Sequence, residues 1–343
     1  MPLSFLYGFA IRVRNLFFNT GVLKSHSYSF PVISVGNLST GGTGKTPHVE
    51  YLLSLLIENY KIATLSRGYG RSTKGFLMAD KQSIASQIGD EPLQYYSRYG
   101  EKIRVAVGED RVQAINKIKT LSSSTEVIIL DDAYQHRYVN PGLSILLTDF
   151  RNPFYRDYLL PAGNLREPRI GSKRADIIIV TKCADNLSQR VQKKCIDKIK
   201  PLPTQMVFFS GLKYRDPVSL NNGSTLNLDT LKNVEVLLVT GIANPTSIKS
   251  FFSDICAAVY LLRFSDHHPF SREDIRFIER NFNTIASSKK IIITTEKDAM
   301  RLKESSISSH LNSLPVYSLP VQVYFLHQQK EFDQYILNYV KNN

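Results

Sequence analysis

The sequence has few cysteines and no long hydrophobic run, and each absence excludes a class of protein. Cys183, Cys195 and Cys256 are too few and too widely spaced for a disulfide framework or a zinc site, so we expect a reducing compartment. The mostly apolar stretch at residues 3–11 is far shorter than the roughly 20 residues needed to span a bilayer. The 343 residues, 43% of them hydrophobic, contain no repeat or low-complexity tract and are long enough for two domains.

The chain also lacks a concentrated block of positive charge, although its formal net charge is +13. A basic surface attracts nucleic acid, anionic lipid or phosphorylated substrates, and charge alone does not distinguish them. Because no run of five basic residues and no nucleic-acid-binding motif is present, we expect no nucleic-acid partner. A phosphorylated substrate and an anionic membrane remain, beside the simpler alternative of a generally basic soluble protein.

The N-terminal stretch PLSFLYGFAIRVRNLFF, residues 2–18, combines five aromatic side chains with nearby arginines. It lacks the basic start of a secretory signal. The composition suits a helix that lies in a membrane interface, and equally an ordinary N-terminal helix packed on the core. The residues alone leave both interpretations open.

The stretch VISVGNLSTGGTGKTPHVEYLL, residues 32–53, predicts a strand, a glycine-rich loop and a helix, which is the context of a phosphate-binding loop. Glycines let successive backbone N–H groups converge on an anion, and the helix N-terminus adds unpaired N–H groups. The lysine would reach the β- and γ-phosphates, and the threonine hydroxyl would ligate Mg²⁺. Ser39 stands where the usual pattern G-x-x-x-x-G-K-[ST] has its first glycine. The residues expected to bind the phosphates are Gly41, Gly42, Thr43, Gly44, Lys45 and Thr46.

Short apolar strands alternate with helical segments over the rest of the chain, which predicts an α/β fold with a parallel sheet covered by helices on both faces. The pattern changes near residue 205, and a second, smaller α/β unit begins at residue 235. The acids Asp131 and Asp132 follow the apolar run at residues 127–130, where the Mg²⁺ partner of a phosphate loop usually lies.

Other charged motifs also follow predicted strands, and each is a weak signal by itself. In DHHPF, residues 266–270, neighbouring side chains diverge, so His267 and His268 do not share a metal; we interpret one as an acid–base or orienting group and the other as structural. Neither TKCAD (181–185) nor TEKD (295–298) fits the guanine-reading pattern [NT]-K-x-D, so GTP is the weaker choice of nucleotide.

Eight motifs, taken in order, resemble those of the tetraacyldisaccharide 4′-kinase family, the lipid A 4′-kinases of Gram-negative bacteria. The resemblance runs from about residue 5 to about residue 302, and Ala133 and Tyr134 replace the Gly and Phe of the family's usual DDGFQH. The motifs are GNLSTGGTGKTP, SRGYGR, GDEP, DDAYQHR, LPAGNLREP, TGIANP, DHHPF and TTEKDAMRL.

This resemblance implies an ATP-dependent and Mg²⁺-dependent kinase that phosphorylates the 4′-hydroxyl of tetraacyldisaccharide 1-phosphate. It also implies a peripheral position on the cytoplasmic face of the bacterial inner membrane, where the acyl chains of the substrate stay in the bilayer. The corresponding residues are Lys45 and Thr46 for phosphates and metal, Asp131 and Asp132 for the metal, Asp90 as catalytic base, His267 as its partner, Arg166 and Glu167 near nucleotide and metal, and Tyr69 near the phosphates.

Four segments follow from the pattern and the resemblance together. They are a P-loop kinase domain with an N-terminal membrane-interface helix at 1–204, a strand-rich connector at 205–234, a smaller α/β domain at 235–320, and a C-terminal strand and helix at 321–343 that pack back on the first domain. Asp90 and His267 would then come from different domains, and hinge closure would assemble the site.

Two alternatives to the kinase remain. One is a P-loop NTPase that couples nucleotide hydrolysis to a partner protein at the membrane. The other is a nucleotide sensor or scaffold without enzymatic activity.

Overall fold

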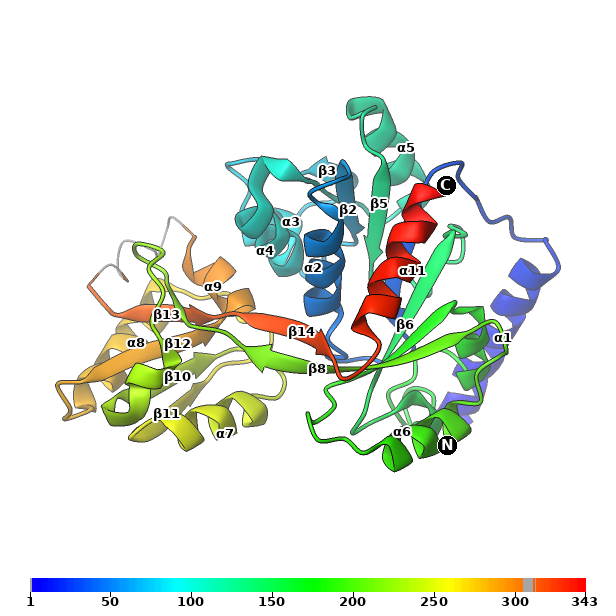
Figure 1. The fold of residues 1–343 in the computed structure, drawn as a ribbon. Helices are drawn as coiled ribbons and strands as arrows, with labels where there is room; N and C mark the ends of the chain where they lie inside the picture. The colour runs from blue at the N-terminus through cyan, green and yellow to red at the C-terminus, as the bar shows by residue number, and fades with distance from the viewer. Residues whose placement is uncertain (1, 305–310, 312) are drawn as a thin grey trace.

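The computed structural model describes residues 2–304, 311 and 313–343, which form two sheets with helices on both faces of each (Figure 1). The larger sheet has nine strands in the order β14-β8-β7-β6-β1-β5-β2-β4-β3. All its neighbouring pairs are parallel except the two at the edges, β14 with β8 and β3 with β4. Its strands are β1 Val32–Asn37, β2 Ile62–Ser66, β3 Leu77–Met78, β4 Arg104–Val107, β5 Val127–Asp131, β6 Leu143–Asp149, β7 Ile177–Thr181, β8 Met206–Tyr214 and β14 Val321–Phe325.

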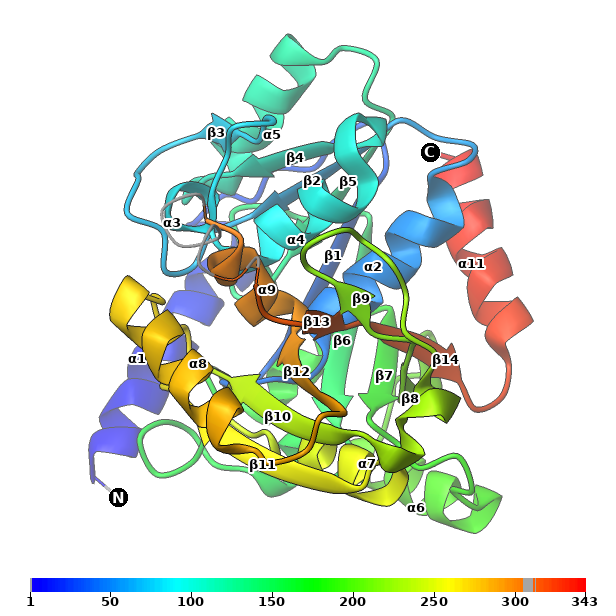
Figure 2. The same cartoon turned by 90° about the vertical axis from the view of Figure 1, so that its left-hand side faces the viewer.

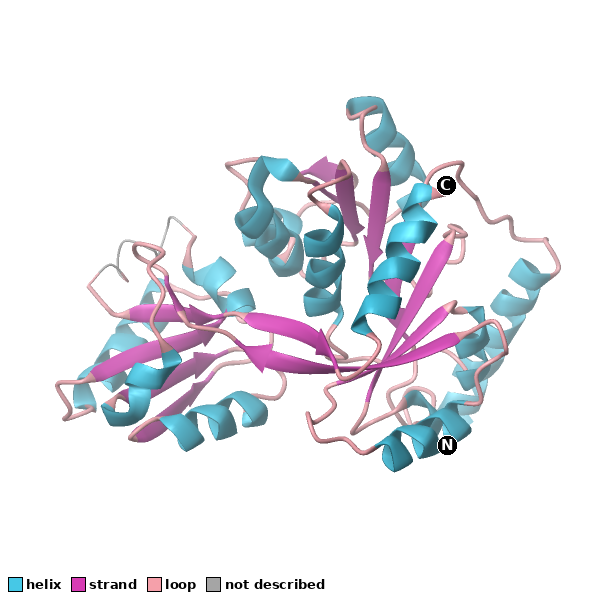
Figure 3. Ribbon diagram, viewed as in Figure 1, coloured by secondary structure: helices cyan, strands magenta, loops and turns pink. Residues whose placement is uncertain are grey.

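Helices cover both faces of the larger sheet because its central strands are apolar on both sides (Figure 3). One apolar cluster joins the sheet to α2 (Lys45–Leu56), α4 (Asp90–Tyr99) and α11 (Gln329–Lys341). Separate clusters on the opposite face contain residues of α5 (Arg111–Leu121) and α6 (Gln189–Ile199). The predicted P-loop-type α/β architecture is confirmed.

The smaller sheet has the order β11-β10-β12-β13-β9 and lies between two further helices. α8 packs on one face and α7 on the other, and the short α9 follows β12. The elements are β9 Val218–Ser219, β10 Glu235–Thr240, β11 Ala258–Arg263, β12 Lys290–Thr295, β13 Val316–Leu319, α7 Thr246–Ile255, α8 Arg272–Thr284 and α9 Glu296–Leu302.

Strands β8 and β14 form the connection between the two sheets (Figure 1). They pair antiparallel from Val321 opposite Tyr214 to Phe325 opposite Ser210. The chain enters the smaller sheet after β8 and returns along β14, and α11 then packs on the larger sheet through Phe332, Ile336 and Val340. The proposed connector, residues 205–234, contributes a strand to each sheet. Its β8 pairs with β7 of the larger sheet, and its β9 pairs with β13 of the smaller sheet.

Helix α1 (Pro2–Asn19) lies at the periphery of the molecule (Figure 1 and Figure 2). One side of it contacts the larger domain: the Tyr7 hydroxyl donates to the Arg166 carbonyl at 2.7 Å, and Phe18 is buried. The other side leaves large apolar side chains in solvent, namely Leu3, Phe5, Leu6, Phe9, Leu16 and Phe17. Over the described part of the chain, every helix is too short or too polar to cross a bilayer. The remaining short helices are α3 Ala85–Ile88 and the 3₁₀ turns 100–102, 154–156, 169–174 and 228–233.

Candidate active site

The loop between β1 and α2 has the backbone geometry of an anion-binding cradle. Gly41 and Gly44 take φ values of 101° and 87°, a region in which residues with a side chain are strained. Gly44 precedes α2 and provides no side-chain cap, so the first N–H groups of the helix stay available to a ligand. Lys45 and Thr46 form the first turn of that helix. The predicted strand, loop and helix therefore come together as a phosphate site requires.

Buried polar contacts hold this loop in position from behind. Asn37 Nδ2 donates to Thr43 Oγ1 at 2.8 Å, and Thr181 Oγ1 donates to the Thr43 carbonyl at 2.8 Å. Burial lowers the pKa of His48 to about 4, so its ring is neutral. Because the Gly44 carbonyl only accepts, His48 Nδ1 donates to it at 2.7 Å, and Nε2 accepts from the Ser210 hydroxyl at 3.0 Å. The loop is thereby tied to β8.

A network of opposite charges lies beside the lysine of the loop. Lys45 Nζ is 3.7 Å from Asp132 Oδ2, and Arg166 Nη2 is 2.7 Å from Asp132 Oδ1. Arg166 also donates to the Asn37 side chain. Burial alone would raise the pKa of Asp132, but Lys45 and Arg166 outweigh it and hold that pKa below its ordinary value. This carboxylate is therefore ionised at neutral pH.

Asp131, the neighbouring acid at the end of β5, has a different environment. It is 4% exposed, and its Oδ2 accepts from the Tyr95 hydroxyl at 2.9 Å. Its Oδ1 is buried and has no hydrogen-bond partner among the described residues. Burial, with added repulsion from Asp132 and Glu91, raises the pKa of Asp131 to about 6. A buried carboxylate oxygen without a partner, next to a phosphate loop, is suited to a cation.

No three His, Cys, Asp or Glu residues of the described chain lie close enough together to form a complete metal site. Mg²⁺ in kinases does not need one, because it binds one or two carboxylates together with substrate phosphates and water. Asp131 and Asp132 offer two carboxylates, and the buried Thr46 offers a hydroxyl oxygen as a further possible ligand. The donor set therefore fits Mg²⁺.

The second part of the site is an acid and a histidine that lie beside different sheets. Asp90 begins α4 beside the larger sheet, and His267 follows β11 of the smaller one. His267 Nδ1 and Asp90 Oδ2 are 2.8 Å apart. The hydrogen bond to Asp90 raises the pKa of His267, against the opposing effect of burial. His268 instead contacts Asp274 at 3.0 Å, at the start of α8.

Two further residues that the sequence analysis named, Tyr69 and Glu167, lie at the edge of this site. Tyr69 is 70% exposed, and its ring centroid is 5.3 Å from that of His267. Glu167 is buried, and both its oxygens accept from Arg174 Nη2 at 2.9 Å. Gln135 Nε2 donates to the same carboxylate at 2.9 Å. A role for Glu167 near nucleotide and metal stays a prediction.

The structure also brings in residues that the sequence did not single out. His48, Asn37 and Tyr95 support the loop and Asp131, and Arg301 contacts Asp90. Three of them had a signal in the sequence, since Asn37 lies in GNLSTGGTGKTP, His48 follows that motif directly, and Arg301 lies in TTEKDAMRL. Tyr95 had none, because an aromatic residue on an amphipathic helix is ordinarily core.

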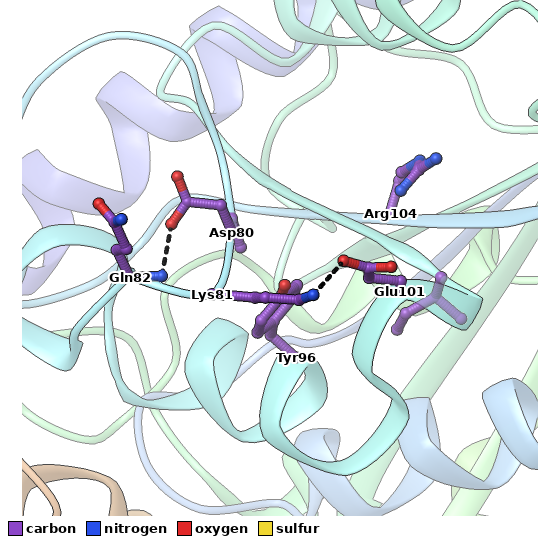
Figure 4. Close-up of a pocket in the computed structure, with 8 residues that line it drawn as sticks. Asp80, Lys81, Gln82, Tyr96, Glu101 and Arg104 are labelled. Atoms are coloured by element: carbon purple, nitrogen blue, oxygen red, sulfur yellow. Dashed lines mark hydrogen bonds and ion pairs between the residues drawn. The ribbon is translucent and has the colours of Figure 1, made fainter.

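A separate hollow of about 390 Å³ lies at the edge of the larger sheet (Figure 4). Its lining includes Asp80, Lys81, Tyr96, Glu101 and Arg104, and none of the site residues described above. Lys81 and Glu101 form an exposed ion pair at 3.2 Å across it. The hollow takes no part in the candidate active site.

Comparison with known proteins agrees with the geometry. The sequence profile described as LpxK, tetraacyldisaccharide-1-P 4′-kinase, matches residues 1–341. Curated tetraacyldisaccharide 4′-kinases of Bacteroides thetaiotaomicron and Flavobacterium psychrophilum are 44% and 43% identical, covering 100% of this chain and 93% and 96% of their own lengths. A crystal structure of LpxK from Aquifex aeolicus in complex with ATP has a TM-score of 0.76 and 27% identity, covering 99% of this chain and 98% of that one. The chain belongs to the tetraacyldisaccharide 4′-kinase family, the kinases of lipid A biosynthesis.

Proposed function

We propose that this kinase transfers the γ-phosphate of ATP to the 4′-hydroxyl of tetraacyldisaccharide 1-phosphate, using the residues gathered at the ends of β1, β5 and β11. The observation that carries this proposal is the phosphate loop with Lys45 directed to Asp132 and with Asp90–His267 as a second pair. Binding of ATP is supported by the similarity to LpxK from Aquifex aeolicus, which was crystallised with ATP.

The loop and its lysine hold the triphosphate in this proposal. Backbone N–H groups of this loop and of the N-terminus of α2 bind the phosphate oxygens, and Lys45 supplies a positive charge. Phosphoryl transfer needs little covalent participation from the protein, so positioning and charge stabilisation provide most of the catalysis. Arg166, paired with Asp132, adds a second positive charge beside the loop.

Mg²⁺ fits this site, with Thr46, Asp131 and Asp132 as its protein ligands. When bound, it neutralises phosphate charge and helps to align the reacting group. The unpaired Asp131 oxygen then has the partner that the described part of the protein does not give it.

Asp90 acts as the general base. As the 4′-oxygen forms its bond to the γ-phosphorus, the hydroxyl proton passes to the Asp90 carboxylate, and the bond from that phosphorus to the β-phosphate oxygen breaks to release ADP. His267 holds the carboxylate through its Nδ1.

The first experiment tests acceptor dependence. Purified enzyme with labelled ATP and Mg²⁺ is expected to give labelled lipid when the detergent-dispersed disaccharide 1-phosphate is present. Free phosphate should stay at the background level without the lipid. Equal ATP hydrolysis with and without the lipid would instead support an NTPase that serves a partner protein, and ATP binding without turnover would support a sensor.

We further propose that α1 rests on the cytoplasmic face of the inner membrane. Its exposed apolar side suits an interfacial helix, and the acyl chains of the substrate need not leave the bilayer. The hydrogen bond from Tyr7 to the Arg166 carbonyl connects this helix to a residue beside the phosphate loop.

Replacing two exposed aromatic residues tests the membrane contact. Phe5 and Phe9 are 77% and 67% exposed, so Phe5→Ser/Phe9→Ser should leave the fold intact. Each buried Phe contributes roughly 1.5–3 kcal/mol, so sedimentation with anionic vesicles should weaken at least about tenfold. The control is Phe277→Ser on α8, which removes an aromatic that is 43% exposed. Unchanged sedimentation of the double variant would exclude α1 as the membrane contact.

A further inference from the structure

Both carboxylate oxygens of Asp90 contact residues that follow strands of the smaller sheet. Oδ2 contacts His267 Nδ1, as described above, and Oδ1 lies 3.3 Å from Arg301 Nε in an ion pair. The side chains of Asp90 and Arg301 are 7% and 8% exposed, so solvent screens this pair little. Asp90 therefore has two fixed neighbours that come from α9 and from the loop after β11.

The guanidinium of Arg301 is itself fixed on its other side. Nη1 donates to the His268 carbonyl at 2.7 Å, and Nη2 donates to Asp298 Oδ1 at 2.9 Å. Nε is buried and makes no hydrogen bond within the described part of the chain, so it meets Asp90 as an ion pair only. A planar guanidinium that is hydrogen-bonded through two nitrogens keeps one orientation, with Nε toward Asp90, which a flexible ammonium would not.

Asp298 anchors this arrangement to the smaller sheet. It is fully buried, and its Oδ2 accepts from the Gly241 N–H at 3.1 Å and from Thr295 Oγ1 at 2.7 Å. Gly241 follows β10 and Thr295 ends β12, so Asp298 is fixed to two neighbouring strands. The chain of contacts runs from the sheet through Asp298 and Arg301 to Asp90.

We infer that Arg301 is a positioning residue for phosphoryl transfer, which fixes the Asp90 carboxylate as the smaller sheet docks, with Asp298 holding Arg301 in turn. The inference rests on the proposed role of Asp90 as the base. A base must present one oxygen to the acceptor hydroxyl within hydrogen-bond reach, and a carboxylate held at a single oxygen can rotate. Contact at both oxygens stops this rotation, and both contacts come from the docked sheet.

The charged groups around Asp90 predict a kinetic signature. His267 and Arg301 contact it directly, Lys297 and Asp298 lie close enough to interact with it electrostatically, and Glu91 interacts with His267. Lys297 is paired with Glu91 and does not replace Arg301. Loss of a neighbouring cation disfavours the ionised form of a carboxylate, so the acid limb of the pH–rate profile should move to higher pH without Arg301.

The test compares wild type with Arg301→Met, Arg301→Lys, Asp90→Asn and Asp90→Asn/Arg301→Met, in the lipid phosphorylation assay. We expect Arg301→Met to lower kcat about 10–100-fold, the effect of a misplaced catalytic group, with the KM for ATP within twofold. Arg301→Lys should recover part of the loss and return the acid limb toward its wild-type position. The double variant should match Asp90→Asn within twofold, because Arg301 acts through Asp90. Arg276→Met, an exposed arginine on α8, is the matched control.

The outcomes separate the inference from the function on which it rests. Wild-type enzyme without lipid product overturns the kinase assignment, and an active Asp90→Asn overturns the base. If the kinase assignment and the role of Asp90 both hold, two results overturn the positioning role of Arg301. One is an unchanged kcat and pH profile in Arg301→Met, and the other is a double variant that is much slower than Asp90→Asn. Removing Arg301 leaves Asp298 as a buried unpaired charge, so Arg301→Met is checked by thermal unfolding. If Arg301→Met does not fold, the kinetics of Arg301→Lys provide the test, and wild-type kinetics in Arg301→Lys reject the inference.

Discussion

Asp90→Asn should reduce kcat of lipid phosphorylation by about 10²–10⁴-fold, the usual contribution of a positioned general base. The amide keeps the size of the side chain and can still contact His267, but it does not take up the proton of the acceptor hydroxyl. ATP affinity should stay within twofold of wild type, because the phosphate loop at residues 41–46 lies on another element. Steady-state kinetics and calorimetric titration with ATP measure the two quantities.

Asp254→Asn is the control for this change, since it removes an exposed carboxylate on α7. It should leave both kcat and ATP affinity at the wild-type values. Near-normal turnover of Asp90→Asn, with the protein folded, would remove Asp90 from the mechanism.

Lys45→Met should have the second large effect, and here ATP binding should fall together with turnover. The change removes the one ammonium group at the start of α2 while keeping much of the apolar stem. Loss of a charged contact to the transferring phosphate typically costs about 10²–10³-fold in kcat. Asp132 keeps its pairing with Arg166 at 2.7 Å, so the fold should survive. Calorimetric titration and the lipid assay again provide the readout.

Lys194→Met, on the exposed side of α6, is the matched control for Lys45→Met. It changes the net charge equally without touching the loop. Turnover of Lys45→Met within threefold of wild type would show that the triphosphate lies elsewhere.

The phosphate loop was predictable because its signals are local. Gly44, Lys45 and Thr46 are adjacent in sequence, and the strand and the helix on either side have clear periodicities. Apolar strands likewise predicted a parallel sheet. The strand order was not predictable, because it depends on how helices pack on two faces at once.

Contacts between segments that are far apart in the sequence could not be predicted from local patterns. Arg301 Nε and Asp90 Oδ1 are 3.3 Å apart, yet they lie on α9 and α4, which pack beside different sheets, and only the contact between these helices brings them together. The resemblance to a family supplied Asp90 and His267, whereas the contacts of Arg301 and His48 came only from the structure. For α1 the two interpretations were not exclusive, because the helix packs one side on the protein and exposes the other.

The antiparallel pair β8–β14 has a mechanical consequence. Two-stranded ribbons take larger twists than broad sheets. Rotation of the smaller sheet can therefore be absorbed as a change in twist along five residue pairs, from Val321–Tyr214 to Phe325–Ser210, with the ladder of hydrogen bonds retained. Ser210 on this ribbon is also hydrogen-bonded to His48, which supports the phosphate loop. A change of twist at Ser210 would therefore act on the loop that is expected to hold the nucleotide.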